Sequence, residues 1–442
     1  MKVRRTLSFP NQPREPLLVR PSLLVNFEKP VYGGAFLARH EGKTIFVPLT
    51  LPGEEARVRI VEDKRGYANA EVEEIVAAAP ERIAAHCKHF GTCGGCHYQH
   101  APYDEQIEFK RAILRETLER GGVHAPAEIA ALAGEPWGYR NRTRMAFDAA
   151  GNPGYRGRRS HAVIPIAECP IAAPVLVDAA LEFAKAARQL APALRPAEIS
   201  LFCNGEETAM LIGVFTTGES KEGFEDLARA LSEQIPALKG MEIVAEGRGG
   251  QPQRTIARWG ASSLAYRAAG FDYRVDHGAF FQVNRWLVDG LVENVTSGLS
   301  GALAWDLFAG VGLFARRLAA SFDRVIAVES APAAMGALRQ NMSGTNAIAV
   351  KAETLDFLRR LPAGERPDLV VVDPPRAGLG AETTALLAQV RAPAMVYASC
   401  DPATLARDLH ALIGAGYAIE NMILADLFPQ TFHLETVVRL RR

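Results

Sequence analysis

The chain has 442 residues, a length that fits about three domains of ordinary size. Its 50 basic and 50 acidic side chains cancel, so total charge gives no reason to expect a nucleic-acid partner, and any basic surface must be local. The basic first residues precede no apolar stretch of signal-peptide length, and no uncharged apolar run reaches about eighteen residues. We therefore expect a cytoplasmic protein without a membrane span. Its 6 cysteines favour metal binding or catalysis over a disulfide framework.

The first part of the chain is expected to form a small barrel. Residues 1–16 are polar and proline-containing, and predict a flexible arm. Between 17 and 78, short alternating segments are separated by Gly-Gly and Pro-Gly turn signals, which is typical of a barrel of the oligonucleotide-binding (OB) type. The alternation over 57–60 places two arginines on one face, an arrangement that is also typical of a solvated barrel surface.

A cluster of cysteines follows the predicted barrel. Cys87, Cys93 and Cys96 bring three thiols together, and the glycines between them allow a tight turn. A fourth ligand must come from elsewhere, either Cys169 or Cys203. Four thiolates suit both structural zinc and an iron–sulfur cluster, so the spacing leaves both open.

The region after the cysteines carries a local basic segment. A helix is expected over 104–120, and a hairpin over 199–215. Between 137 and 161, arginines greatly outnumber acids and alternate with aromatic residues. Arginine binds phosphate and aromatic rings hold unpaired bases, so this segment predicts an RNA-binding surface, although a solvated face would look similar. The residues expected to bind RNA are Arg140, Arg142, Arg144, Tyr155, Arg156, Arg158 and Arg159.

Beyond about residue 269 the pattern becomes a regular alternation of helix and strand, the signature of a doubly wound α/β domain. A glycine-rich turn over 310–312 follows the first strand, and Glu329 ends the second. This also satisfies the dinucleotide fingerprint, so an NAD enzyme stays open. Three features favour S-adenosylmethionine instead: Asp306 is placed for an ammonium group, Asp373-Pro-Pro ends the fourth strand, and Gln282 offers an amide for a carboxylate.

Cys400 stands where a strand should pass into a helix, a position that favours the thiolate. Carbon-5 of uracil attacks a methyl group only after a thiolate has added to C6, and a base must then remove the C5 proton. Glu435, entering the final strand, is a costly buried carboxylate unless it has such a task. His433 is expected to position its neighbours. Arg376 follows Asp-Pro-Pro where base-amino methyltransferases carry an aromatic residue, which argues against N-methylation.

Four motifs together resemble the RNA uracil-C5 methyltransferase family, and the resemblance covers nearly the whole chain. They are Phe-Gln-Val-Asn at 281–284, Asp-Pro-Pro-Arg-Ala-Gly at 373–378, a Ser-Cys-Asp-Pro run at 399–409 and Pro-x-Thr-x-His-x-Glu at 429–435. The resemblance implies that Cys400 is the nucleophile, that Glu435 is the base, and that Asp373 lies where cofactor and uracil meet. The implied cofactor contacts are Gln282, Asp306, Phe308, Gly310, Gly312, Glu329 and Asp373.

The resemblance also bears on the cysteines and on the substrate. The ribosomal-RNA branch of the family carries a 4Fe-4S cluster on a spacing like that of Cys87, Cys93, Cys96 and Cys169, which leaves Cys203 as a core residue. Gln430 stands where members usually have histidine, a departure that touches neither nucleophile nor base. We therefore expect methylation of C5 of one uridine in 23S rRNA by a monomeric enzyme, with a tRNA uridine as the close alternative.

As a whole, the sequence predicts an α/β multidomain enzyme. Its parts would be the arm, an OB-like TRAM barrel over 17–78, a central α/β domain with the cluster and the RNA-binding surface over 79–268, and a Rossmann-like class I methyltransferase domain over 269–442. Two other classes stay open, an iron–sulfur NAD oxidoreductase and a non-catalytic RNA-binding factor.

Overall fold

The computed structural model describes residues 22–247, 253–361 and 365–442, so the predicted arm over 1–16 lies outside the described residues. The chain forms two compact units. One comprises the chain up to Lys29 together with Ala35–Pro80, and the other comprises Pro30–Gly34 and Glu81–Arg442. Within the described ranges, no helix is long and apolar enough to cross a membrane.

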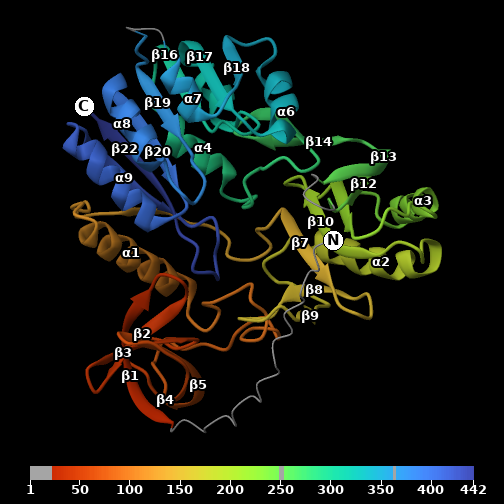
Figure 1. Cartoon of the computed structure of the whole chain (residues 1–442), viewed down its shortest axis with the longest axis vertical. Helices are drawn as coiled ribbons and strands as arrows, with labels where there is room; N and C mark the ends of the chain where they lie inside the picture. Colours follow the sequence, from red (N-terminus) through yellow and green to blue (C-terminus); the bar gives the residue numbers. More distant parts are fainter. Residues whose placement is uncertain (1–21, 248–252, 362–364) are drawn as a thin grey trace, which may run out of the picture. The chain divides into compact units, whose positions relative to one another are not determined.

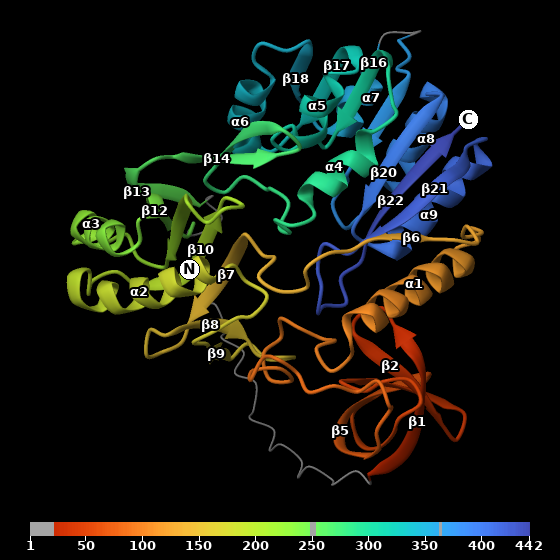
Figure 2. The ribbon, with the colours of Figure 1, turned by 180° about the vertical axis from the view of Figure 1, so that it is seen from behind.

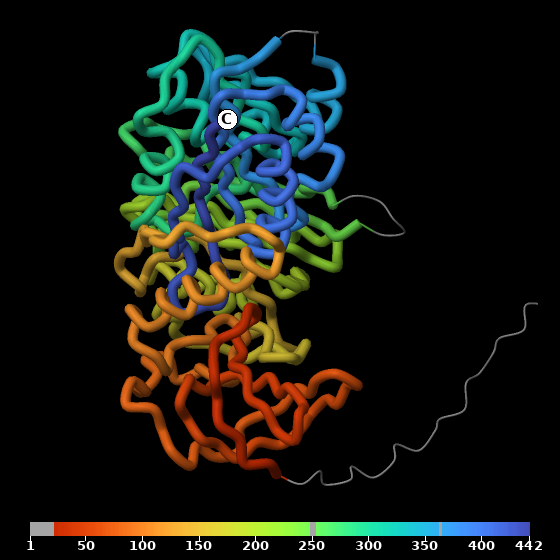
Figure 3. Tube along the Cα trace, turned by 90° about the vertical axis from the view of Figure 1, so that its left-hand side faces the viewer, coloured from red at the N-terminus to blue at the C-terminus, as the bar shows by residue number. Residues whose placement is uncertain are grey.

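The first unit is a closed barrel, as expected, and its trace is drawn in red and orange in Figure 3. The strand order is β1-β2-β3-β5-β4. Its strands are β1 (Leu23–Val31), β2 (Ala35–His40), β3 (Lys43–Pro48), β4 (Glu55–Asp63) and β5 (Tyr67–Ala77). The buried carboxylate of Glu54 accepts the backbone N–H groups of Leu51 at 2.8 Å and Ala79 at 3.3 Å. Arg57 and Arg59 lie on one exposed face of β4, where both pair with glutamates of β5.

A seven-stranded sheet in the second unit has the order β13-β12-β11-β10-β7-β8-β9. Its elements are β7 (Arg142–Phe147), β8 (Pro153–Arg156), β9 (Val163–Pro165), β10 (Pro196–Cys203), β11 (Met210–Thr216), β12 (Leu238–Ala245) and β13 (Arg254–Gly260), with α2 (Pro174–Leu190) and α3 (Phe224–Gln234). Both helices pack on one face of this sheet, where alternate residues such as Ile199, Leu201 and Ile212 are buried against them (Figure 1). The expected hairpin is the antiparallel pair β10–β11.

The second sheet of this unit has eight strands in the order β18-β17-β16-β19-β20-β22-β21-β6. They are β6 (Ala130–Leu132), β16 (Gly301–Leu307), β17 (Phe322–Glu329), β18 (Ala347–Lys351), β19 (Leu369–Val372), β20 (Ala394–Ser399), β21 (Ala418–Ala425) and β22 (Glu435–Arg441). The five strands from β16 to β20 are parallel, as the sequence predicts, and β22 runs antiparallel between β20 and β21.

Helices cover both faces of the eight-stranded sheet (Figure 1). The core on one face includes α4 (Val288–Thr296), α5 (Leu313–Leu318) and α6 (Pro332–Met342). The core on the other includes α1 (Tyr103–Arg120), α8 (Gly380–Val390) and α9 (Pro402–Gly414), with α7 (Thr354–Arg359) contributing Leu358. A two-stranded hairpin, β14 (Ser263–Ala268) and β15 (Phe271–Asp276), joins the first of these cores.

Part of the predicted central domain, the segment between Cys96 and Cys169, contributes a strand and a covering helix to the C-terminal sheet. Strand β6 pairs in parallel with β21, so residues 130–132 lie beside 423–425 (Figure 2). Helix α1, just before β6, packs its buried face against α9. The predicted central and C-terminal domains therefore belong to one compact unit.

Candidate active site

Cys400 lies at the carboxyl end of β20, directly before the first turn of α9. The next residue, Asp401, caps the helix, because its carboxylate accepts the N–H groups of Ala403 at 3.0 Å and Thr404 at 2.9 Å. The first free N–H groups of α9 are thus satisfied by Asp401 rather than turned toward the thiol.

The pKa of the Cys400 thiol is raised to about 12, first by burial, then by Glu435 and then by Asp373, while Arg376 lowers it. This direction is opposite to the one predicted from the helix start. The prediction fails because the cap uses the N–H groups and because two carboxylates converge on the thiol from other strands. These surroundings favour the protonated form of the thiol.

Two acidic side chains complete this cluster. Asp373 follows β19, and burial raises its pKa to about 7. Glu435 is the first residue of β22 and only 8% exposed. Its pKa is well above the ordinary value because of burial, with a further increase from Asp373 and an opposing effect of Arg376. A carboxylate with a raised pKa is a stronger base than an exposed one.

His433 lies beside these groups as a neutral imidazole. Its pKa is lowered to about 3, mainly by burial and also by Arg376. The Arg376 guanidinium donates to its Nδ1 at 2.9 Å. Arg376 therefore acts on both the imidazole and the thiol, and the positioning role of His433 stays a prediction.

The predicted cofactor loop connects β16 to α5. Asp306 is fully buried at the end of β16, where its Oδ2 accepts the N–H of Ala315 at 2.8 Å and its Oδ1 has no partner among the described residues. Burial raises its pKa to about 8. Glu329 accepts the N–H of Gly310 at 2.8 Å. Gly312 has φ +90°, and a Cβ there would lie 2.7 Å from the side chain of Met342.

One pocket brings several predicted cofactor residues together. Gln282, Phe308, Gly310 and Asp373 line it, together with Phe280. Asp373 thus borders both this pocket and the surroundings of Cys400. Asp306, Gly312 and Glu329 are not among the residues that line it.

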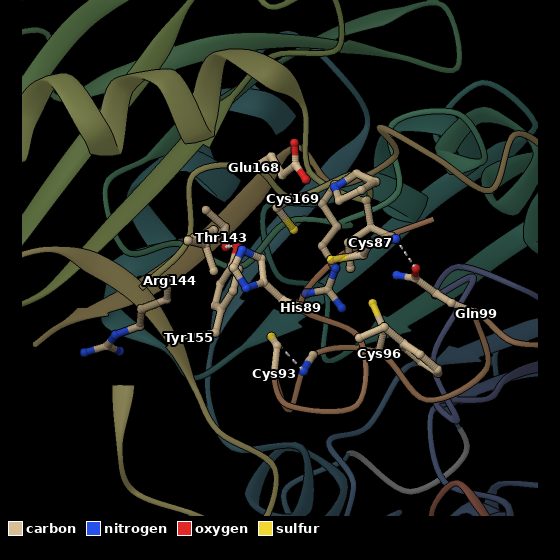
Figure 4. A pocket seen from close by; sticks show the side chains of 16 residues that line it. Cys87, His89, Cys93, Cys96, Gln99, Thr143, Arg144, Tyr155, Glu168 and Cys169 are labelled. Atoms are coloured by element: carbon tan, nitrogen blue, oxygen red, sulfur yellow. Dashed lines mark hydrogen bonds between the residues drawn. The ribbon is translucent and has the colours of Figure 1, made fainter. Parts of the chain in front are cut away.

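The four cysteines Cys87, Cys93, Cys96 and Cys169 line a second cavity, of about 270 Å³ (Figure 4). Burial raises the pKa of Cys93, of Cys169 and, to about 12, of Cys96, while the guanidinium of Arg140 lowers all three. Among the described residues, no group of three or more Cys, His, Asp or Glu is arranged to hold a single metal ion. Cys203 lies elsewhere, buried in the core under α2, as expected.

The seven residues predicted to bind RNA fall into two groups. Arg140, Arg142 and Arg144 line a groove of about 690 Å³ on the seven-stranded sheet. In this groove the Arg142 guanidinium lies 4.5 Å from the ring centre of Phe202, and that of Arg144 lies 4.1 Å from Phe215. Sequence reasoning missed both phenylalanines, whose alternation along β10 and β11 was the available signal.

The other four residues do not line this groove. Arg156 pairs with Glu198 at 3.5 Å, and Arg159 is exposed. Arg158 donates its backbone N–H to Thr92. Tyr155 is turned into the cysteine cavity, where its hydroxyl bonds Thr143 at 2.6 Å (Figure 4). A ring that lines this cavity is not placed to stack on a base at the surface.

Sequence comparison finds close relatives over nearly the whole chain. The profile of tRNA (uracil-5-)-methyltransferase matches residues 366–442, and that of the TRAM domain matches 17–72. An uncharacterized RNA methyltransferase of Streptomyces avermitilis is 34% identical over 92% of this chain and 95% of its own length. The 23S rRNA (uracil(1939)-C(5))-methyltransferase RlmD of Halomonas elongata is 31% identical over 90% of this chain and 85% of its own.

The strand order of the eight-stranded sheet, its antiparallel β22 and the glycine loop after β16 define a class I methyltransferase. The Pyrococcus abyssi tRNA (uracil-54, C5)-methyltransferase, solved with S-adenosyl-L-homocysteine, shares the fold with a TM-score of 0.75 at 23% identity, covering 94% of this chain and 100% of that one. With relatives above 30% identity along almost its full length, the chain belongs to the RNA uracil-C5 methyltransferase family.

Proposed function

We propose that this enzyme transfers the methyl group of S-adenosylmethionine to C5 of a uridine in 23S rRNA through a covalent bond to Cys400. The observation that carries the proposal is the convergence of Cys400, Glu435 and Asp373, from three strand ends, beside the pocket lined by Gln282 and Phe308.

The proposed steps follow from these groups. The Cys400 thiolate adds to C6, and the electron pair displaced from the C5–C6 double bond makes C5 nucleophilic. C5 then takes the methyl group from the sulfonium: the S–CH3 bond breaks, its electron pair stays on sulfur, and S-adenosylhomocysteine is the leaving group. Glu435 removes the C5 proton, the C5–C6 double bond re-forms, and the S–C6 bond breaks to release the thiolate. Asp306 would accept the ammonium group of the cofactor, and Glu329 its ribose hydroxyls.

Turnover should rise with pH between about 6 and 9. Cys400 must lose its proton before addition, and Glu435 must be ionised to accept the C5 proton, yet both pKa values are raised in the fold. A raised pKa leaves the inactive, protonated form dominant at the lower pH. Single-turnover rates at saturating S-adenosylmethionine would measure this, and a rate that is flat or falls over this range would contradict the assignment.

The cysteine cavity would hold a 4Fe-4S cluster bound by Cys87, Cys93, Cys96 and Cys169. Four thiols around about 270 Å³ suit a group larger than one ion. Around a single tetrahedral zinc the sulfurs would lie only about 3.8 Å apart, given a Zn–S bond of about 2.3 Å. Arg140 supplies positive charge next to the thiolates. Methyl transfer itself needs no electrons, so we assign the cluster to folding and RNA docking.

Replacing Cys169 with serine should remove iron and acid-labile sulfide from the anaerobically purified protein, because one of the four thiolates is lost. The control is Cys203→Ala, which changes a buried cysteine outside the cavity. Elemental analysis would distinguish an iron–sulfur cluster from a zinc ion. Full iron content in Cys169→Ser, or stoichiometric zinc in the wild type, would contradict the cluster assignment.

Unpaired nucleotides of the RNA would lie in the groove formed by Arg142, Arg144, Phe202 and Phe215. The guanidinium groups of Arg142 and Arg144 lie over phenylalanine rings, and groups of these kinds bind phosphates and stack on bases. Two acids border the groove, and both are already paired: Glu242 with Arg258 at 3.2 Å and Asp276 with Arg274 at 2.6 Å. Because uracil C6 must reach a partly buried thiol, the target has to be flipped out or unpaired.

The substrate is tested with methyl-labelled S-adenosylmethionine and unmodified 23S rRNA and tRNA transcripts, followed by nucleoside analysis. We expect labelled 5-methyluridine in the ribosomal transcript. Label in the tRNA alone would support methylation of uracil C5 but contradict the assignment of 23S rRNA as the substrate. No 5-methyluridine in either, from protein with its iron content intact, would favour the RNA-binding factor or the oxidoreductase.

A further inference from the structure

The loop between β21 and β22, residues 426–434, leads directly to Glu435. Hydrogen bonds from several other segments hold its backbone. Four successive carbonyls accept hydrogen bonds from outside the loop. Leu427 accepts from the Asn284 amide at 3.2 Å, and Phe428 from Lys110 Nζ at 3.0 Å. The Pro429 carbonyl accepts from the Tyr139 hydroxyl at 3.0 Å. The Gln430 carbonyl accepts from the backbone N–H groups of His97 at 2.8 Å and Tyr98 at 3.1 Å.

Helix α1 adds a second layer of bonds to the same loop. The N–H of Gln430 donates to Gln106 Oε1 at 2.9 Å, and Gln106 Nε2 donates to Gln430 Oε1 at 3.0 Å. One turn along the helix, Lys110 Nζ lies 2.5 Å from Asp426 Oδ1 in a fully buried ion pair. Gln106, Lys110 and Gln430 are all at most 2% exposed, so water does not substitute for these bonds.

Gln430 is the centre of this arrangement. Its backbone has φ +67°, a conformation that side-chain-bearing residues rarely adopt, and its N–H, carbonyl and side chain are all bonded to other segments. A backbone in this region persists only where the surroundings impose it.

The segment that holds the Gln430 carbonyl is continuous with the cysteine cavity. His97 and Tyr98 directly follow Cys96, which lines the cavity. Arg140 also lines the cavity, and its guanidinium lies 5.9 Å from the ring centre of Phe428 in the loop. The cavity and the loop are thus joined both through backbone bonds and through a side chain.

We propose that segment 96–98 and α1 form a clamp on loop 426–434 that positions Glu435 for removal of the C5 proton. As a consequence, a change in what occupies the cysteine cavity should alter the removal of the C5 proton. It should not alter the binding of S-adenosylmethionine. The proposal rests on the proposed function only for the identity of the step. In that step the C5 proton passes to the Glu435 carboxylate, its electron pair forms the C5–C6 double bond, and the S–C6 bond breaks to release the Cys400 thiolate.

The first test is Gln106→Leu, which removes the amide while keeping most of its volume. The matched control is Glu108→Leu, an exposed position on the same helix. The binding of S-adenosylmethionine should stay within about twofold of wild type, because the cofactor pocket uses other segments. The steady-state fraction of RNA covalently attached to the protein should rise at least about fivefold, the equivalent of one net hydrogen bond lost from the positioning of the base.

A merely structural role for Gln106 predicts a different pattern. Turnover would then fall without accumulation of the adduct, or cofactor affinity would fall in parallel, and either result would overturn the clamp. If Gln106→Leu does not fold, Gln106→Met removes the same bonds with an unbranched side chain and is judged by the same criteria.

Hydrogen exchange of the full-length protein gives a readout that needs no methylation. Amide exchange in 426–434 should speed up in Gln106→Leu and in Cys96→Ser, but not in Glu108→Leu. Unchanged exchange in Cys96→Ser would contradict the proposed coupling between the cysteine cavity and loop 426–434. If the wild type forms no 5-methyluridine, the proposed function fails while these exchange data still decide whether the clamp exists.

Discussion

Replacing Cys400 with alanine is expected to abolish 5-methyluridine formation, with a loss of roughly 10⁴-fold or more, because C5 becomes nucleophilic only when the Cys400 thiolate adds to C6. Cofactor binding should survive. The pocket lined by Gln282, Phe308, Gly310 and Asp373 does not include the thiol, so affinity for S-adenosylmethionine should stay close to that of wild type. Equilibrium binding and single-turnover methylation measure the two quantities separately.

Cys203→Ala is the matched control for this substitution. It removes the same sulfur from a buried position in the core beneath α2, far from the loop after β20 in the chain. Cys203→Ala should keep its methylation activity. Its thermal stability should decrease only by the amount that a small cavity costs. Turnover of Cys400→Ala near the wild-type rate would rule out the covalent route.

Glu435→Gln should stall the reaction after methyl transfer. The amide keeps the shape of the side chain but cannot accept the C5 proton, so the S–C6 bond has no route to break. We expect turnover to fall by about 10²–10⁴-fold and a protein–RNA adduct to accumulate that survives denaturing electrophoresis. The same change at Glu420, an exposed residue of β21 paired with Arg441, should leave turnover unchanged.

The burial of Glu435 gives this substitution a second expected effect. A carboxyl group with a raised pKa is less stable when ionised, so the neutral amide should not destabilise the fold at neutral pH. Thermal unfolding would check that the loss of activity is not a loss of structure. A well-folded Glu435→Gln that forms no adduct would move the role of base to another residue.

Much of the fold follows from local sequence patterns. The strands β16 to β20 were predictable because parallel strands buried on both faces read as continuous apolar runs, such as Leu369–Val372. The helix after the cysteines and the hairpin β10–β11 carry their own turn signals. Cys400, Asp373 and Glu435 stood out in the sequence because Cys400 lies between a strand and a helix start, Asp373 belongs to the Asp-Pro-Pro motif after a strand, and a carboxylate such as Glu435 is costly in a buried strand.

The electrostatics of the site depends on contacts that local sequence does not contain. Glu435 and Asp373 reach Cys400 from β22 and β19, and together with burial they raise a pKa that the helix start alone would lower. Tyr155 reads as part of a basic, aromatic surface, yet the pairing of β8 with β7 and β9 turns it into the cysteine cavity. The bonds of Gln430 to Gln106 join residues 324 positions apart, beyond any pattern of spacing.

The central claim, a covalent bond from Cys400 to the uracil that receives the methyl group, has a direct test in the wild-type enzyme. A 23S rRNA fragment carrying 5-fluorouridine is incubated with S-adenosylmethionine, since fluorine at C5 cannot be removed as a proton and the adduct cannot resolve. After proteolysis and nuclease treatment, mass spectrometry should find a methylated fluorouridine on the peptide that contains Cys400. No adduct, or an adduct on another cysteine, would contradict the mechanism.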